Sequence, residues 1–262
     1  ILQNIFENNK DYKNKIDIPR LVVVGSQSSG KSSLLNGILS FDLLPTGTNM
    51  VTRTPLHLEL IPDNSSKNIA EFGHYRNDKW VVKKTLNFTL PTPLQEEKTD
   101  IINEIHKQTI QIVGKNSNIG KIPIHLKIYA KDIPNLTLVD LPGLTMVACT
   151  DKGQPKNIKD KIRHLVGSYI NHKNTIILAV MPARTDLEAD IALDLIKQYD
   201  PTGIRTIGIL TKVDLMNDNT DIVKYLENNV SKDLQLKYGY YAVRNRTPKE
   251  AKLNTIKEAF AL

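Results

Sequence analysis

A glycine-rich turn between a strand-like and a helix-like segment constrains this sequence more than any other feature. Residues 21–24 read LVVV, residues 25–32 read GSQSSGKS, and residues 31–39 carry a helical apolar pattern. This order matches the phosphate-binding motif Gly-x-x-x-x-Gly-Lys-Ser/Thr in the context that the motif requires. The backbone N–H groups of such a loop and the following helix N-terminus face a phosphate. The feature predicts a nucleotide-binding domain, but kinases, ATPases and GTPases all share it.

The individual residues of this loop have distinct expected roles. Lys31 would reach the β- and γ-phosphates, and the Ser32 hydroxyl would bind Mg²⁺. The residues expected to contact the nucleotide here are Gly25, Ser26, Gln27, Ser28, Ser29, Gly30, Lys31, Ser32 and Ser33.

Strand-like and helix-like segments alternate along the rest of the chain. The strand-like segments are residues 21–24, 56–61, 71–75, 80–84, 122–129, 136–139, 175–181, 205–210 and 240–243, and the helix-like segments are 31–39, 91–113, 155–170, 186–199, 220–229 and 248–260. Near-continuous apolar strands alternating with helices predict an α/β fold with a mostly parallel central sheet flanked by helices. The two short segments 71–75 and 80–84 are expected to be antiparallel. Ligands of such sheets bind at the carboxyl ends of the strands.

Asp140-Leu-Pro-Gly143 follows the expected strand 136–139 directly. An aspartate at this position of a phosphate-binding fold holds Mg²⁺ through water, and the Gly143 amide can donate to the γ-phosphate. The motif Asp-x-x-Gly is common by itself, so its place after a strand and after the phosphate loop is what gives it weight.

Thr211-Lys212-Val213-Asp214 lies at the end of the expected strand 205–210. A carboxylate here can accept two hydrogen bonds from guanine, whereas adenine would leave it unpaired at a cost. The motif therefore favours GTP and disfavours an ATP-using enzyme. Residues 244–247, which include Asn245 and Arg246, follow the next strand and are expected to close on the base.

The loop between the first helix and the second strand is expected to cover the γ-phosphate. A threonine hydroxyl from it would complete the Mg²⁺ shell. The candidates are Thr46, Thr48, Thr52 and Thr54, and position alone does not choose among them.

The composition sets wider limits. The chain has 262 residues, 40% of them hydrophobic, and a single cysteine, Cys149, which fits a reducing compartment. The formal net charge is +7, but the excess is spread along the chain without an arginine-rich tract, so we interpret it as solvated surface plus a phosphate site and expect no nucleic-acid partner. The apolar runs are too short to span a membrane. The chain starts at Ile1 and stops after a helix-like segment, so we expect a piece of a larger protein.

The phosphate loop, residues 44–56 (LPTGTNMVTRTPL), Asp140–Leu144 and residues 200–216 together resemble the dynamin superfamily of large GTPases, from about Pro19 to the C-terminus. The resemblance implies a P-loop GTPase fold with dynamin-type insertions over residues 18–262, apparently truncated at its C-terminus. Residues 1–17 resemble the first part of the family's hinge helix bundle.

The resemblance also assigns catalytic roles. Gln27 resembles the glutamine that orients the attacking water, and Thr52 resembles the switch threonine that binds Mg²⁺. Ser28, with backbone carbonyls near Gly47 and Asn49, resembles the site of a monovalent cation, K⁺ or Na⁺, that offsets charge developing between the phosphates.

Further residues are carried over at the base and at the dimer contact. The residues expected at the base are Thr211, Lys212, Asp214, Leu215, Asn217, Asn245 and Arg246. Asp186 resembles an aspartate that reaches across a dimer to the partner's nucleotide.

The resemblance implies a cytoplasmic GTPase that dimerises through its nucleotide face and couples hydrolysis of GTP to membrane remodelling, either fission or fusion. Higher assembly and peripheral membrane attachment would rest on regions outside this chain. The alternative is a GTP-loaded interaction module that hydrolyses little. The presence of Gln27, Ser28 and Thr52 argues against that alternative.

Overall fold

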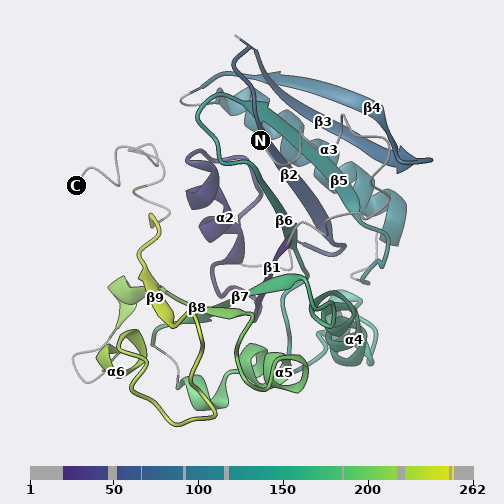
Figure 1. Cartoon of the computed structure of the whole chain (residues 1–262). Coiled ribbons are helices and arrows are strands. Elements are labelled where there is room, and N and C mark those ends of the chain that lie inside the picture. Colours follow the sequence, from purple (N-terminus) through teal and green to yellow (C-terminus); the bar gives the residue numbers. More distant parts are fainter. Residues whose placement is uncertain are drawn as a thin grey trace.

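A computed structural model describes residues 20–46, 52–65, 67–90, 93–114, 118–184, 186–216, 222–247 and 250. The helix expected over residues 248–260 and the expected arm at residues 1–17 lie outside the described residues, apart from Glu250. The described chain forms one nine-stranded sheet in the order β4-β3-β5-β2-β6-β1-β7-β8-β9 (Figure 1).

The strands are β1 (Arg20–Gly25), β2 (Leu56–Pro62), β3 (Asn68–Arg76), β4 (Lys79–Phe88), β5 (Ile124–Ala130), β6 (Leu136–Asp140), β7 (Thr175–Pro182), β8 (Thr206–Thr211) and β9 (Tyr240–Val243). The five strands β6, β1, β7, β8 and β9 run parallel to one another. Strand β2 pairs with β6 in the antiparallel sense and with β5 in the parallel sense, and β3 is antiparallel to both of its neighbours. The predicted α/β fold is confirmed, with a mostly parallel sheet and an antiparallel extension.

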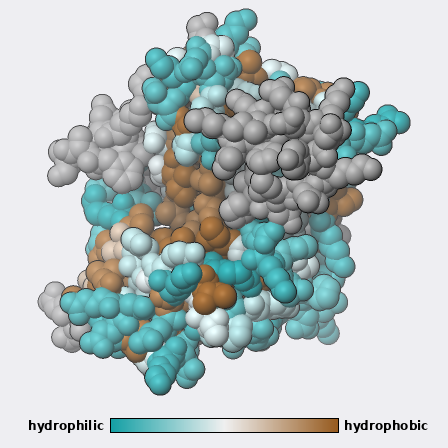
Figure 2. Space-filling view, in the orientation of Figure 1, coloured by the Kyte–Doolittle hydropathy of each residue, from teal (hydrophilic) through white to brown (hydrophobic). Residues whose placement is uncertain are grey.

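Alternate residues of the strands build two cores, one on each face of the sheet. On β1, Val23 joins the core beneath α2 (Lys31–Leu39) and α3 (Gln95–Val113). Its neighbours Val22 and Val24 join the core beneath α4 (Ile158–Ile170) and α5 (Ile191–Tyr199). Because neighbouring side chains of a strand point to opposite faces, this apolar run can be buried on both sides. Figure 2 shows apolar side chains gathered along the middle of the molecule and hydrophilic ones around its periphery.

Several expected elements differ from the observed ones. The expected helix 220–229 is a single turn among the described residues, α6 (Val223–Leu226). The chain turns at Asn228, which has a left-handed backbone with φ 54° and whose side chain donates to Leu236 O and accepts from Leu236 N. These contacts replace further helical hydrogen bonds. In the expected helix 186–199, Asp190 caps the amides of Ala192 and Leu193, so α5 begins only at Ile191.

The two antiparallel strands are longer than expected. Strands β3 and β4 cover nine and ten residues, whereas the sequence suggested only 71–75 and 80–84. The reason is that β4 is an exposed edge strand, whose lysines hide the alternation that normally identifies a strand. Trp80 packs on this hairpin, with its ring 5.2 Å from that of Tyr75.

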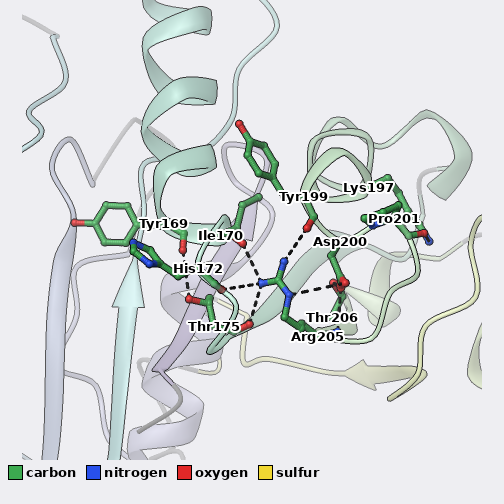
Figure 3. A network of polar contacts seen from close by, with 10 residues as sticks. All are labelled: Tyr169, Ile170, His172, Thr175, Lys197, Tyr199, Asp200, Pro201, Arg205 and Thr206. Atoms are coloured by element: carbon green, nitrogen blue, oxygen red, sulfur yellow. Dashed lines mark hydrogen bonds and ion pairs between the residues drawn. The ribbon is translucent and has the colours of Figure 1, made fainter. Parts of the chain in front are cut away.

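Arg205 closes the end of the sheet where β7 and β8 begin (Figure 3). Its guanidinium donates at 2.8–3.2 Å to four carbonyls: those of Ile170 at the end of α4, His172 just after it, Thr175 on β7 and Tyr199 at the end of α5. Asp200 accepts from the Arg205 backbone N–H and from the Thr206 hydroxyl. One side chain therefore joins two helix ends to two strands.

Two histidines that are distant in sequence meet on the neighbouring strands β2 and β5, close to α4. The rings of His57 and His125 lie 4.8 Å apart, and His57 Nε2 lies 3.0 Å from the Tyr169 hydroxyl of α4. Within the described residues no group of three or more His, Cys, Asp or Glu is placed to hold a metal. None of the described helices combines the length and the apolar composition that a membrane crossing requires.

Candidate functional site

The phosphate loop leaves β1 at Gly25 and enters α2 at Lys31, and both of its glycines are required by the backbone. A Cβ on Gly25 would lie 2.4 Å from Val180 O, and Gly30 has a left-handed φ of 101°. Both positions therefore exclude larger side chains. Ser28 also has a left-handed backbone, φ 63°, an uncommon conformation for serine that marks the loop interior as constrained.

Lys31 is buried at the start of α2 and lies across the loop. Its Nζ donates to Ser26 O at 3.0 Å and to Gly25 O at 3.3 Å. Burial lowers the pKa of Lys31, while the charge of Asp140 opposes that shift. A bound anion would supply the counter-charge that burial makes favourable here.

The Asp-x-x-Gly loop is bound to the phosphate loop by backbone hydrogen bonds. Gln27 N donates to Leu144 O at 2.9 Å, and Leu144 N donates to Gly25 O at 3.0 Å. A Cβ on Gly143 would lie 2.8 Å from Gln27 Cα and 3.0 Å from Lys31 Nζ. The close approach of these two loops therefore requires glycine at position 143.

Asp140 ends β6 beside Lys31 and is buried. Its Oδ2 accepts from Thr52 Oγ1 at 2.8 Å, while its Oδ1 is buried and has no hydrogen-bond partner among the described groups. Burial raises the pKa of Asp140, against the lowering effects of Lys31, Thr52 and the Leu141 amide. A carboxylate oxygen of Asp140 and the Thr52 hydroxyl, which meet here, together with the Ser32 hydroxyl would supply the all-oxygen ligands that Mg²⁺ prefers.

The four threonine candidates are separated by their contacts. The hydroxyl of Thr52 meets Asp140, whereas that of Thr54 donates to Ile122 O. Thr46 is exposed, and Thr48 lies outside the described residues, together with Gly47 and Asn49. The structure therefore brings Thr52 and Asp140 together over 88 residues of sequence.

The motif at residues 211–214 lies next to the phosphate loop at the end of β8. Thr211 Oγ1 donates to Ser29 O at 2.5 Å, and Lys212 has a left-handed φ of 58°. Asp214 is exposed within the turn η3 (Val213–Leu215). Burial lowers the pKa of Lys212; Arg184 lowers it further and Asp214 raises it. Strand β8 therefore places this turn beside the phosphate loop.

The remaining predicted residues lie around this centre. The Asn245 side chain lies beside α2, where its Oδ1 would be 3.9 Å from a Cβ on Gly37, and the Arg246 guanidinium contacts Asp42. Asp186 is exposed and caps the turn η2 (Leu187–Ala189) by accepting from Glu188 N at 3.1 Å. Asn217 lies outside the described residues. Sequence reasoning did not identify Asp42, whose only signal is a charge within the apolar run FDLL.

Comparison with known proteins places the same motifs in one family. The Dynamin family matches residues 21–213. The chain is 42% identical to Dynamin of Drosophila melanogaster over 236 residues, covering 90% of this chain and 24% of that protein. It is 45% identical to Vacuolar protein sorting-associated protein 1 of Schizosaccharomyces pombe over 244 residues, covering 91% and 35%. It is 42% identical to Dynamin-A of Dictyostelium discoideum over 255 residues, covering 95% and 27%. The chain thus spans about a quarter to a third of the length of these relatives.

Proposed function

The chain belongs to the dynamin family, and from that premise we propose that it binds GTP with Mg²⁺ and hydrolyses it to GDP and phosphate. The observation that carries this proposal is the convergence of Lys31, Asp140 and Thr52. Two buried charged groups and a hydroxyl meet at the carboxyl ends of β1 and β6, where a nucleotide of this fold binds.

In the proposed complex, Lys31 turns from the loop carbonyls to the β- and γ-phosphates, and Gly143 N–H donates to the γ-phosphate. Ser32 and Thr52 would hold Mg²⁺ directly and Asp140 through water. When bound, Mg²⁺ neutralises charge on the phosphate oxygens during transfer. Asp214 accepts from guanine, so ATP binds more weakly.

Gln27 orients the attacking water in this proposal. It lies two residues after β1, and its backbone is fixed by the hydrogen bond to Leu144 O, so its side chain starts from a defined position beside Gly143. The residue after Gly143 is Leu144, which cannot orient a water. Ser28, with the backbone near Gly47 and Asn49, would hold K⁺ or Na⁺ against the charge that develops between the phosphates.

We further propose that two copies meet through the nucleotide face, with Asp186 reaching the partner's site. Exposed apolar side chains beside this face, including Met146, Val147 and Leu215, support such a contact. In the longer protein this domain would serve a cytoplasmic machine that remodels membranes. The name of the Schizosaccharomyces pombe relative, which refers to vacuolar protein sorting, supports a role of that kind.

Single-turnover hydrolysis of GTP, measured at increasing protein concentration with and without Mg²⁺, tests the proposal. We expect Mg²⁺-dependent turnover whose rate per molecule rises with concentration, because a partner completes the site. Binding of GTP with negligible hydrolysis at every concentration would instead identify a GTP-loaded interaction module. Equal affinities for ATP and GTP would contradict the role of Asp214.

A further inference from the structure

Asp42 holds the guanidinium of Arg246 with both of its carboxylate oxygens. Arg246 Nη2 lies 2.6 Å from Oδ1 and 2.7 Å from Oδ2. The Arg246 side chain is only 9% exposed, and that of Asp42 is 33% exposed. A charge-assisted contact at these distances, with its guanidinium buried and its carboxylate partly exposed, is stronger than a fully exposed ion pair.

The position of Asp42 is itself fixed by the helix that follows the phosphate loop. The neighbours Phe41 and Leu43 are buried in the core beneath α2. The buried amide of Asn36, on α2, accepts from Leu43 N at 3.1 Å and from Leu44 N at 2.8 Å, and donates to Leu44 O. Asp42 is therefore attached rigidly to α2, and through α2 to the phosphate loop.

Arg246 lies in the middle of the loop expected to close on the base, and that loop is held on both sides. Before it, β9 pairs with β8 up to Val243 and Thr211. After it, Thr247 N donates to Glu250 Oε2 at 2.7 Å, and Glu250 N donates to Thr247 Oγ1 at 3.2 Å. The contact with Asp42 is a third attachment, and it joins the loop to the phosphate side of the site.

We propose that Asp42 is a positioning residue for guanine nucleotides, which holds the base-side loop at residues 244–247 through Arg246. This rests on the proposed function, because the loop matters only if a base binds beside it. Arg246 then contributes by placing the loop, while its guanidinium faces Asp42 rather than the nucleotide. Since the base is common to GDP and GTP, both nucleotides depend on the contact equally.

The test uses fluorescent GDP and GTP analogues with this chain and measures dissociation rates and steady-state kinetics. Asp42→Asn keeps the size of the side chain and removes its charge. We expect it to speed dissociation of both nucleotides about tenfold and to raise KM by a similar factor at unchanged kcat. Arg246→Gln should match it closely, because the only other ion pair of Asp42 among the described residues is a longer one to Lys98, at 3.8 Å. The double variant should be no worse than Asp42→Asn, because the Asp42–Arg246 contact is already lost in that single variant.

Asp194→Asn is the matched control. It breaks the ion pair with Arg163, 3.1 Å long, between α4 and α5, and should leave both rates unchanged. Circular dichroism verifies that each variant is folded. A variant with the two residues exchanged, Asp42→Arg with Arg246→Asp, should recover part of the nucleotide affinity that the single variants lose.

Three results would overturn the proposal. Unchanged dissociation in Asp42→Asn would remove the role of Asp42. A loss in Arg246→Gln alone would mean that the guanidinium contacts the nucleotide itself. A larger loss for GTP than for GDP would place the defect at the γ-phosphate. Failure of the unsubstituted chain to bind either nucleotide would instead refute the proposed function, and the inference with it.

Discussion

The two ends of strand β8 carry similar residues and differ in how their polar groups are satisfied. At its start, Thr206 donates to Asp200, and Arg205 donates to four backbone carbonyls. At its end, Thr211 donates to the phosphate loop, where the hydroxyl of Ser29 is buried without a hydrogen-bond partner among the described groups. We call the first the scaffold end and the second the nucleotide end.

The difference shows that, in the described part of the chain, buried polar and charged groups without a full set of partners are concentrated at the nucleotide end. At the nucleotide end, burial lowers the pKa of Lys31 and raises that of Asp140, so both charged forms are disfavoured without a ligand. Substitutions at the nucleotide end should therefore reduce binding or turnover with little loss of stability, and those at the scaffold end should do the reverse.

Lys31→Ala should have the largest effect. We expect nucleotide affinity to fall by about a thousandfold or more, because in the proposed complex the ammonium group contacts two phosphates. The free energy of unfolding without ligand should be unchanged or higher, because a buried charge is removed. Fluorescent nucleotide titration and urea unfolding measure the two effects, and a marked loss of stability would show that Lys31 also serves the scaffold.

Arg205→Ala tests the opposite end. It leaves the carbonyls of Ile170, Thr175 and Tyr199 without their donor, which should lower the free energy of unfolding by about 3 kcal/mol. Nucleotide affinity of the folded protein should change less than about twofold. A strong loss of affinity in folded Arg205→Ala would mean that the two ends are coupled.

Gln27→Ala separates binding from chemistry within the nucleotide end. Turnover should fall by about a hundredfold, the usual scale for a residue that positions a reacting water, while affinity for GTP is kept. Single-turnover hydrolysis beside equilibrium titration gives both values. Normal turnover in this variant would remove the proposed role of Gln27.

A smaller, pH-dependent effect is expected at His57, away from both ends. Burial, His125 and Arg20 lower the pKa of His57 from 6.5 to about 4. Between pH 6.5 and about pH 4 the unfolded chain binds the proton at His57 and the folded chain does not. The free energy of unfolding therefore falls as the pH drops, by about 2 kcal/mol from pH 6.5 to about pH 5.

The His57→Gln variant is the control for that measurement. Its urea unfolding should depend less on pH over the same interval, because one titrating group is gone. Equal slopes for both proteins would assign the pH dependence to other groups.

Local sequence predicted the strand–loop–helix unit at residues 20–39 almost to the residue, because its glycines, lysine and apolar periodicity all lie within one short segment. It also placed Asp140 and Asp214 near the carboxyl ends of their strands; Asp140 is the last residue of β6, and Asp214 follows β8. The choice of Thr52 needed the family resemblance, since four threonines share the loop and only tertiary contact with Asp140 separates them.

Two features could not be predicted, for physical reasons. Asp42 acquires its partner from 204 residues away, and no local pattern encodes such a pair. The early end of α6 depends on Asn228 bonding across to Leu236, which competes with the helix only once the fold has formed.

The reversal of strand direction between β6 and β2 has a mechanical consequence. The outer strands β2 to β5 join the parallel half of the sheet through this one pairing, which runs from Leu56 opposite Asp140 to Leu60 opposite Leu136. Thr52 precedes Leu56 by four residues and donates a hydrogen bond to Asp140. A pull on the outer strands along their length would act on this pairing as shear, and the Thr52–Asp140 contact lies just beyond the end of that pairing.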